Sequence, residues 1–519
     1  MKNTLSGADL MVRAAHDEGV RLCLTQPGAG ALPLARSLVR EPGVRPVLAL
    51  CEGVAAGIAD GYARLARRPA MVLIQGLGLA HAAPHLRHAR RARSSVLAVV
   101  AHEVPRVDGE AAPAETLEAI AATASGWHAT TQHVADVGWD LIDAVGTCRV
   151  DRVPATLLVP LEVQGAEAEE LPVVPAERVR RAQVGEDRVV DCARRFFTAE
   201  VVVVLAGGDA LRSEALPHLA ALARRPGVRC FAESAPAVAE RGAGRPGLPR
   251  LPARPDQVSS LLCGADLVLL VGAGLSTDVC GGLDAGADPP GRARLVTLCG
   301  PVDACADALG RLVESLPPPL PRPPAPLQLR STTPSAANPG DARGAAAAAQ
   351  ILAARLPQHA VLSVEDDGWA DTVAAAASEA APHTLLSTPG GSFGQALPVA
   401  VGAALAAPHR PVLAVQSPGG AHYTAQALWT MAREQLDVTV LIPSPRPART
   451  SRRRGRAGDR ARPQGAIRLA SPAHPAVGWA EIARGYGVPA HDAGSDDELD
   501  GVLARVLREK GPHVVLLDA

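Results

Sequence analysis

The chain has 519 residues, too many for one hydrophobic core, and a prior of roughly 100 to 200 residues per domain suggests three domains. Its 52 basic and 53 acidic residues nearly cancel, which argues against nucleic acid and anionic membranes as partners. Nine scattered cysteines without a CxxC pair, and no apolar run near the roughly 18 residues that span a bilayer, favour the reducing cytoplasm. Nearly all of the positive charge is arginine, which we attribute to coding bias.

Residues 1–170 alternate amphipathic helical stretches with short apolar runs. These runs are PVLAL, AMVLI, SVLAVVA and ATLLVPL. Buried strands of a parallel sheet have this continuous apolar character, because helices cover both faces of the sheet. We therefore expect the first domain to be a parallel α/β layer.

A second α/β unit is expected over residues 184–312, where VVVVLAG and DLVLLVGAG are apolar runs that end in glycine turns. The turn Gly272-Ala273-Gly274 resembles the start of a dinucleotide fingerprint, but Thr277 stands where its third glycine belongs. We interpret it as a tight strand-end turn, which gives no support for FAD. Residues 313–344 are rich in proline and predict a semi-extended linker.

The third domain is expected over residues 345–519. Apolar runs predict strands at AVLSVE, PVLAVQ, VTVLIP and HVVLLDA, with helices at Ala396–Ala406 and over 425–434. Residues 446–465 have many like charges and no apolar period, so we expect a solvated, mobile loop, with an anion-binding flap as the alternative. The predicted fold class is α/β, with three doubly wound domains and mainly parallel sheets.

The segment LALCEGVAAGIADGYARLARRPAMVLI, residues 48–74, resembles the part of thiamine-diphosphate enzymes that carries their catalytic glutamate, and Glu52 falls on it. Further segments resemble acetolactate synthase large subunits: HLRHARRARSSVLAVVAHE, ERGAGRPGLPRLP, GGSFGQALPVAVGAALAAPHRPVLAVQ and YTAQALWTMAREQLDVTVLI. The resemblance covers nearly the whole chain. It implies a pyrimidine-binding, a central and a diphosphate-binding domain in that order.

The resemblance also implies chemistry and partners. In the family, a carboxyl group shares a proton with the cofactor's aminopyrimidine to generate the ylid that attacks a 2-oxo acid, which makes Glu52 the catalytic residue. The glutamate of one subunit meets the diphosphate domain of another, so a homodimer or tetramer is expected. The implied cofactor-binding positions are Gly390, Gly391, Ser392, Phe393, Gly419, Gly420 and Ala421; the implied pocket lining is Gln26, Pro27, Gly28, Ile74, Gln75, Gly76 and His81.

The positions that hold Mg²⁺ in the family are altered. Its Gly-Asp-Gly is here Ser417-Pro418-Gly419, and its paired asparagines are Ser444-Pro445. Proline has no side-chain oxygen, so neither Pro418 nor Pro445 can bind a metal through its side chain. We expect no Mg²⁺ at this site and impaired binding of thiamine diphosphate, unless arginines of the 446–465 loop replace the cation.

His81, His85 and His88 are spaced to share one helix face. A Zn²⁺ site is one interpretation. Pro84 lies inside the run, and polar packing or pocket lining is the interpretation that we favour.

Three functions remain open from the sequence. The first is decarboxylation or carboligation of 2-oxo acids with thiamine diphosphate. The second is a cofactor-free enzyme that uses Glu52 as acid or base, since function belongs to the site rather than to the fold. The third is a non-catalytic pseudoenzyme or scaffold that pairs with an active paralogue.

Overall fold

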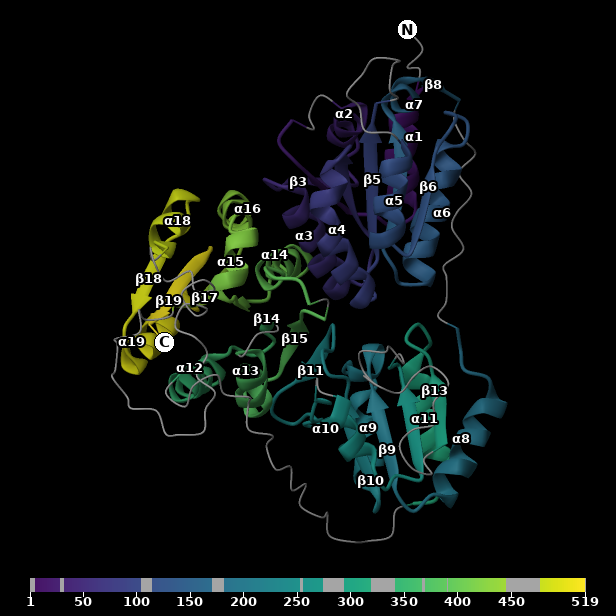
Figure 1. Ribbon diagram of the computed structural model, residues 1–519, viewed down its shortest axis with the longest axis vertical. Helices are drawn as coiled ribbons and strands as arrows, with labels where there is room; N and C mark the ends of the chain where they lie inside the picture. The colour runs from purple at the N-terminus through teal and green to yellow at the C-terminus, as the bar shows by residue number, and fades with distance from the viewer. Residues whose placement is uncertain are drawn as a thin grey trace, which may run out of the picture.

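The structure of the chain, a computed structural model, describes residues 5–28, 32–103, 114–169, 182–252, 255–273, 294–318, 341–365, 369–389, 391–444 and 477–518. Figure 1 shows three α/β units, the first at the top, the second at the lower right and the third at the left. The three-domain α/β fold with mainly parallel sheets is therefore confirmed. In the described part of the chain, no helix has the length and apolar character needed to cross a membrane.

The first domain is built on a six-stranded parallel sheet in the order β3-β2-β4-β5-β7-β6. Its strands are β2 (Leu22–Thr25), β3 (Arg45–Leu48), β4 (Ala70–Gln75), β5 (Val96–His102), β6 (Trp127–Thr130) and β7 (Ala155–Pro160). Its helices are α1 (Gly7–Asp17), α2 (Pro33–Arg40), α3 (Glu52–Ala66), α4 (Gly78–Arg91), α5 (Ala114–Ala124), α6 (Val137–Val150) and α7 (Leu161–Gly165). A short antiparallel pair, β1 (Leu5–Ser6) with β8 (Glu167–Ala168), ties its two ends together.

The central domain has a four-stranded parallel sheet in the order β10-β9-β12-β13. Its strands are β9 (Val202–Ala206), β10 (Val228–Ala232), β12 (Leu267–Val271) and β13 (Arg294–Cys299). Its helices are α8 (Glu186–Thr198), η2 (Gly208–Leu211), α9 (Leu216–Ala223), α10 (Pro255–Leu262) and α11 (Cys305–Ser315).

The third domain has a seven-stranded sheet in the order β11-β15-β14-β16-β17-β19-β18. Its strands are β14 (Val361–Val364), β15 (His383–Ser387), β16 (Val412–Val415), β17 (Val438–Ser444), β18 (Ala490–Ala493) and β19 (His513–Asp518). Its helices are α12 (Asp341–Arg355), α13 (Ala370–Ala376), η3 (Ala377–Glu379), α14 (Ala396–Ala406), α15 (Pro418–Thr424), α16 (Ala427–Arg433), α18 (Trp479–Gly485) and α19 (Asp496–Val506). The edge strand β11 (Ala239–Arg241) comes from the central region of the chain and pairs antiparallel with β15.

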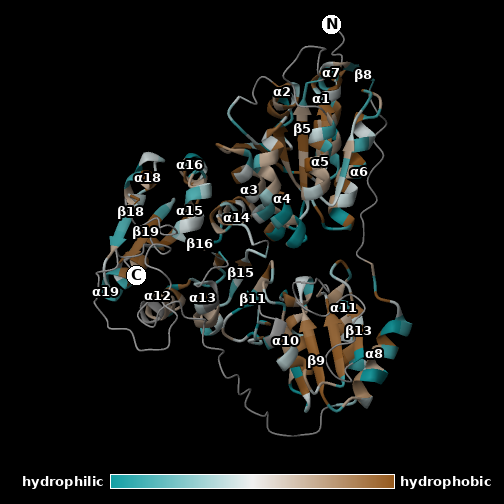
Figure 2. Cartoon of the chain, in the orientation of Figure 1, coloured by the Kyte–Doolittle hydropathy of each residue, from teal (hydrophilic) through white to brown (hydrophobic). Residues whose placement is uncertain are grey.

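The strands form because both faces of each sheet are covered. Every residue of β5, β9, β12, β14 and β16 is buried, and Figure 2 shows β5 and β9 in brown. Continuous apolar runs are what a doubly covered parallel strand requires. The continuous apolar runs of the sequence therefore indicate which strands are buried on both faces.

Two helices join the first and third domains by close backbone contact. A Cβ added at Gly61 of α3 would lie 2.1 Å from the carbonyl oxygen of Val399, and one at Gly402 of α14 would lie 2.0 Å from that of Ile58. Only glycine permits this approach at both positions. Helix α14 is almost entirely buried, as expected for a helix that is apolar on all sides.

Candidate functional site

Glu52 is the first residue of α3, and three residues separate it from the end of β3. Cys51 is the N-cap and makes no side-chain capping bond, so the Glu52 carboxylate is the acidic group of the first turn. A carboxylate there interacts favourably with the exposed amide dipoles at the helix start. The Glu52 side chain is 19% exposed, which leaves it open to a small molecule.

Helix α4 packs against the carboxylate of Glu52. The Nδ1 atom of His81 lies 3.4 Å from Oε2 of Glu52, and the His81 side chain is 75% exposed. A Cβ added at Gly78 would lie 2.5 Å from Oε1 of Glu52, so a larger residue at this position would displace the Glu52 side chain. The structure thus pairs the partly exposed carboxylate of Glu52 with the imidazole of His81, and both groups can transfer protons.

The turns after β2 and β4 lie beside each other at the point where the order of the sheet reverses. A Cβ added at Gly28 would lie 3.9 Å from Oε1 of Gln75, and Gly28 and Gly76 both have positive φ, 89° and 42°. Ligands bind at such switch points in doubly wound sheets.

Three further residues predicted to line the pocket lie in these turns or in the strand before them. The amide nitrogen and oxygen of Gln26 are buried without a hydrogen-bond partner among the described residues. Pro27 lies between Gln26 and Gly28 in the turn. Ile74 is fully buried in the core.

The strand ends of the third domain converge on another carboxylate, that of Glu365, which follows β14 and is 3% exposed. Its Oε2 accepts hydrogen bonds from the Ser417 hydroxyl at 2.6 Å, from the Ser417 amide at 3.2 Å and from Nε2 of Gln416. Its Oε1 accepts from the amide of Gly394. One carboxylate therefore takes four donors from the loops that follow β15 and β16.

The same loops contain the predicted cofactor-binding positions. Ser417 is the N-cap of α15 and accepts a hydrogen bond from the Gly420 amide at 2.9 Å, while Pro418 is the first residue of the helix. A Cβ added at Gly420 would lie 2.1 Å from Oε2 of Glu365, whereas one at Gly419 would meet open space. Ala421 is buried.

The loop after β15 supplies the other predicted cofactor-binding residues. Phe393 is exposed and stacks on Tyr423, with ring centroids 6.1 Å apart. The amide of Ser392 donates to Nε2 of His88 at 3.1 Å, and Gly391 has a φ of 73°. Gly390 and Pro445 lie outside the described residues, as does the 446–465 loop, and Ser444 is the last residue of β17.

A magnesium-bound diphosphate does not fit these residues. Pro418 has neither an oxygen ligand nor an amide hydrogen at the place implied for the metal. Four donors at the ends of β15 and β16 already bind the carboxylate of Glu365. A diphosphate placed there would face a buried like charge, which costs several kcal/mol when it is not compensated.

The histidines of α4 have separate partners. Nδ1 of His85 binds Oε1 of Gln395, whose amide donates to Asp60 at 3.1 Å, and His88 contacts Ser392. Burial lowers the pKa of His88 to about 4 and also lowers that of His85, so both rings are neutral near pH 7. No cluster of three or more His, Cys, Asp or Glu suited to a metal occurs among the residues that the structure describes.

A buried ion pair completes this contact between domains. Asp60 and Arg64 of α3 are both inaccessible, and the Arg64 guanidinium also donates to the Ser387 carbonyl at 2.7 Å. Sequence reasoning identified neither this pair nor Glu365. The signal for Glu365 was a carboxylate directly after a buried apolar run, which has no motif of its own.

Glu52 and Glu365 form two separate clusters. No hydrogen bond joins them among the described residues, because Glu52 contacts α4 whereas Glu365 contacts the loops before α14 and α15. The expected meeting of Glu52 with the diphosphate domain of a second subunit stays a prediction.

Two family models match the chain. The N-terminal TPP binding domain of thiamine pyrophosphate enzymes matches residues 5–119, and their C-terminal TPP binding domain matches residues 366–517. The chain is 35% identical over 521 residues to IlvX of Mycobacterium tuberculosis, which bears the name of an acetolactate synthase large subunit, with 98% of both chains covered. It is 25% identical to the benzoylformate decarboxylase of Pseudomonas aeruginosa, covering 99% of this chain and 98% of the relative.

Solved structures agree on the fold. The thiamine diphosphate-dependent 4-hydroxybenzoylformate decarboxylase of Rhodococcus jostii RHA1 superposes with a TM-score of 0.80 at 20% identity, covering 99% of each chain. This similarity extends over all three domains.

Proposed function

This chain belongs to the thiamine pyrophosphate enzyme family and is similar to its acetolactate synthase large subunits, and we propose that it acts on a small 2-oxo acid without magnesium-bound thiamine diphosphate. In this proposal Glu52 transfers the proton.

The observation that carries the proposal is the position of Glu365. Its carboxylate accepts four hydrogen bonds from the ends of β15 and β16, beside Pro418, where the family relationship implies a diphosphate and its metal. Because the Glu365 carboxylate already accepts these hydrogen bonds, the same donors cannot compensate the charge of a second anion. The site around Glu52 contains its carboxylate and the imidazole of His81. It also contains the Gln26 amide, which has no hydrogen-bond partner among the described residues.

The substrate class comes from the relatives. Benzoylformate, in the name of one relative, is a 2-oxo acid. It has no hydrogen on a carbon next to its carbonyl group, so the proposed reaction requires a 2-oxo acid that has one, such as pyruvate. In the proposed reaction the Glu52 carboxylate removes a proton from the carbon next to the carbonyl group, so that a C–H bond breaks and an O–H bond forms on Glu52. The enolate that results takes the proton back from Glu52 at the same carbon, and His81 orients the carboxylate through its 3.4 Å contact.

Exchange of the methyl protons of pyruvate in D₂O tests this proposal. The protein is stripped of cofactor and kept in EDTA, and the methyl signal is followed by proton NMR. We expect exchange faster than in protein-free buffer, at least about tenfold slower in Glu52→Gln, and unchanged in Glu115→Gln, the matched first-turn carboxylate of α5. Exchange at the protein-free rate contradicts the proposal, and exchange that requires added thiamine diphosphate and Mg²⁺ supports the family chemistry instead.

A second candidate function is that of a non-catalytic partner of an active paralogue. It is favoured by the stacked pair Phe393 and Tyr423, which are 62% and 64% exposed at the end of the third sheet. Exposed aromatic pairs are typical of surfaces that a partner protein covers. This candidate predicts that a complete paralogue co-purifies with the chain and that Glu52→Gln leaves the function of the pair unchanged.

A further inference from the structure

Two cysteines of the central domain lie against each other where β13 leads into α11. Cys299 is the last residue of β13, and Cys305 is the first residue of α11. Their Sγ atoms are 3.1 Å apart, and the Cys299 thiol donates a hydrogen bond to the Cys305 sulfur. Both are free thiols, and neither residue is more than 1% exposed. Among the cysteines that the structure describes, no other pair is joined by a hydrogen bond.

A tight turn brings the two thiols together. The cysteines are six positions apart in the chain. The Gly300 amide donates to Oδ2 of Asp303 at 2.7 Å, and the Cys305 amide donates to the Asp303 carbonyl oxygen at 3.0 Å. These bonds fix the turn, so the two sulfur atoms are held close together in the folded chain.

The two thiols differ in their surroundings. The hydrogen bond with Cys305, followed by burial, raises the pKa of Cys299 above its usual value, so Cys299 remains a thiol. The Cys305 sulfur accepts the hydrogen of that thiol and lies at the start of α11, where the amide dipoles favour negative charge. The reactive form of a cysteine is the thiolate. Cys305 is therefore the better nucleophile of the pair.

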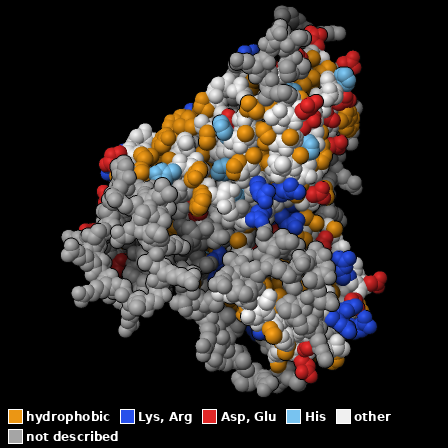
Figure 3. Space-filling model, viewed as in Figure 1, with side chains coloured by type: hydrophobic (Ala, Val, Ile, Leu, Met, Phe, Trp, Pro, Cys, Tyr) orange, Lys and Arg blue, Asp and Glu red, His pale blue; other side chains and the backbone are white. Residues whose placement is uncertain are grey.

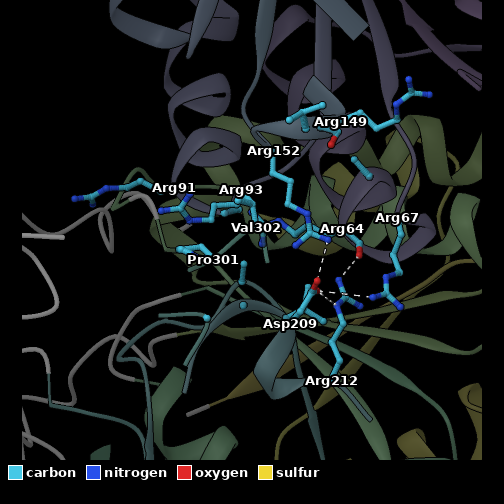
Figure 4. Close-up of a pocket in the computed structure, with 18 of the residues that line it drawn as sticks. Arg64, Arg67, Arg91, Arg93, Arg149, Arg152, Asp209, Arg212, Pro301 and Val302 are labelled. Carbon is cyan, nitrogen blue, oxygen red and sulfur yellow. Dashed lines mark hydrogen bonds and ion pairs between the residues drawn. The ribbon is translucent and has the colours of Figure 1, made fainter. Parts of the chain in front are cut away.

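Cys305 lies one residue behind the wall of a cleft between the first and the central domain. The cleft has a volume of about 440 Å³, and Gly272, Pro301 and Val302 line it. A Cβ added at Gly272 would lie 2.9 Å from Sγ of Cys305. Figure 4 shows arginine side chains entering the cleft, and in Figure 3 basic side chains gather where the first domain meets the lower part of the molecule. A small polar molecule can therefore approach the wall behind which this sulfur lies.

Packing alone does not explain the pair. A buried cysteine commonly acts as a small apolar side chain, and Cys192 and Cys230 fill the core of the same domain in this way. One cysteine and any other small residue would fill the space between β13 and α11 equally well. Two sulfur atoms that face each other across a turn are instead placed to form a bond.

We propose that Cys299 and Cys305 are a site of reversible oxidation, at which a peroxide converts the two thiols into a disulfide. First, the Cys305 sulfur attacks one oxygen of hydrogen peroxide: an S–O bond forms, the O–O bond breaks, and the released hydroxide leaves as water with the Cys305 proton. Second, the Cys299 sulfur attacks the Cys305 sulfur: an S–S bond forms, the S–O bond breaks, and the second hydroxide leaves as water with the Cys299 proton. The two thiols lose two electrons, which reduce one peroxide to two molecules of water. A thiol reductant such as glutathione reverses the change.

Oxidation changes the turn between the cysteines. A disulfide has a bond length of about 2.05 Å, so the side chains or the turn must shift by about 1 Å from the 3.1 Å separation. Pro301 and Val302 lie in this turn and line the cleft, so the wall that faces the first domain differs between the two redox states. A closed loop also restricts the local opening of the chain.

Peptide mapping of the full-length protein after treatment with hydrogen peroxide tests the proposal. The tryptic peptide 295–311 contains Cys299 and Cys305 and no other cysteine. We expect this peptide to lose the mass of two hydrogen atoms, to resist alkylation, and to recover its mass and its alkylation after treatment with reduced glutathione. Hydrogen exchange of the backbone amides in the turn should slow at least about threefold in the disulfide form.

Three variants separate the roles of the two sulfur atoms. Cys299→Ser should trap a sulfenic acid on Cys305 that reacts with dimedone, whereas Cys305→Ser should leave Cys299 unmodified. Cys230→Ser, in the neighbouring core of the same domain, is the control and should form the disulfide like the unaltered chain. Circular dichroism and the melting temperature check that each variant is folded, and the mapping of the unaltered chain stands without them.

Four results overturn the proposal. The peptide keeps its mass under conditions that oxidise the exposed Cys263, or it gains oxygen without losing hydrogen. A disulfide joins either sulfur to another cysteine, such as Cys280, which lies outside the described residues. In the fourth, Cys305→Ser forms a sulfenic acid on Cys299, which reverses the assigned roles. None of these results depends on the proton-exchange experiment, which concerns Glu52 alone.

Discussion

Removal of the Glu365 side chain should destabilise the third domain more than any exposed substitution. Glu365→Ala leaves four donors without an acceptor in a site where the native side chain is 3% exposed. A buried donor that loses its partner costs about 1 kcal/mol or more, so the total loss is on the order of 4 kcal/mol. At roughly 2 to 4 °C for each kcal/mol in a domain of this size, the melting temperature should fall by about 10 °C.

Scanning calorimetry measures this loss, with Glu379→Ala, an exposed carboxylate of η3, as the matched control. Added formate should raise the melting temperature of Glu365→Ala, because it can replace the lost carboxylate, and should leave the unaltered chain unchanged. A loss below about 1 kcal/mol, or an equal effect of formate on both proteins, would refute the assignment of Glu365 as the internal anion.

Gly61→Ala should lower the free energy of unfolding by about 2 to 3 kcal/mol in urea, because its Cβ would lie 2.1 Å from the Val399 carbonyl oxygen. The control Gly146→Ala places its Cβ in open space on α6 and should be neutral or stabilising. Equal losses in the two variants would contradict the packing argument. Burial raises the pKa of Glu233 from 4.5 to about 7, so the folded chain binds more protons than the unfolded chain in this range and stability falls as the pH rises. At pH 8 the free energy of unfolding of Glu233→Gln should therefore exceed that of the unaltered chain by up to about 3 kcal/mol, whereas at pH 4 the two should be equal. A difference that does not depend on pH would exclude the raised pKa of Glu233 as its cause. Light scattering at micromolar concentration should give two or four times the mass of the chain, and a monomer would contradict the expected oligomer.

Burial explains what the sequence predicts well. Helix α14 has the expected bounds, Ala396–Ala406, and the apolar runs of β5, β9, β12 and β16 are the strands of the three sheets. Such runs need no knowledge of distant contacts, because a strand covered on both faces is apolar throughout. Strand β11 carries no such run, and its pairing with β15 depends on a contact far along the chain.

The site depends on contacts that local patterns do not record. Glu365 accepts hydrogen bonds from donors 29 and 52 residues away, and the proline at position 418 gives no indication in the sequence of the carboxylate beside it. Arg67, Arg93 and Arg152 come from the ends of three separate helices and line one cleft between the first and the central domain (Figure 4). Because arginine is abundant throughout the chain, the composition does not single them out. The sequence indicated the 446–465 loop as the cationic region, whereas in the structure seven arginines of the described residues line this cleft.

The most direct test of the account is isothermal titration of thiamine diphosphate into cofactor-stripped protein, with and without Mg²⁺. The account predicts no Mg²⁺-dependent saturable heat and no Mg²⁺-dependent rise in melting temperature, since Glu365 and Pro418 leave no place for a metal-bound diphosphate. Saturable binding that requires Mg²⁺ would contradict it and would restore the family's cofactor chemistry to this chain.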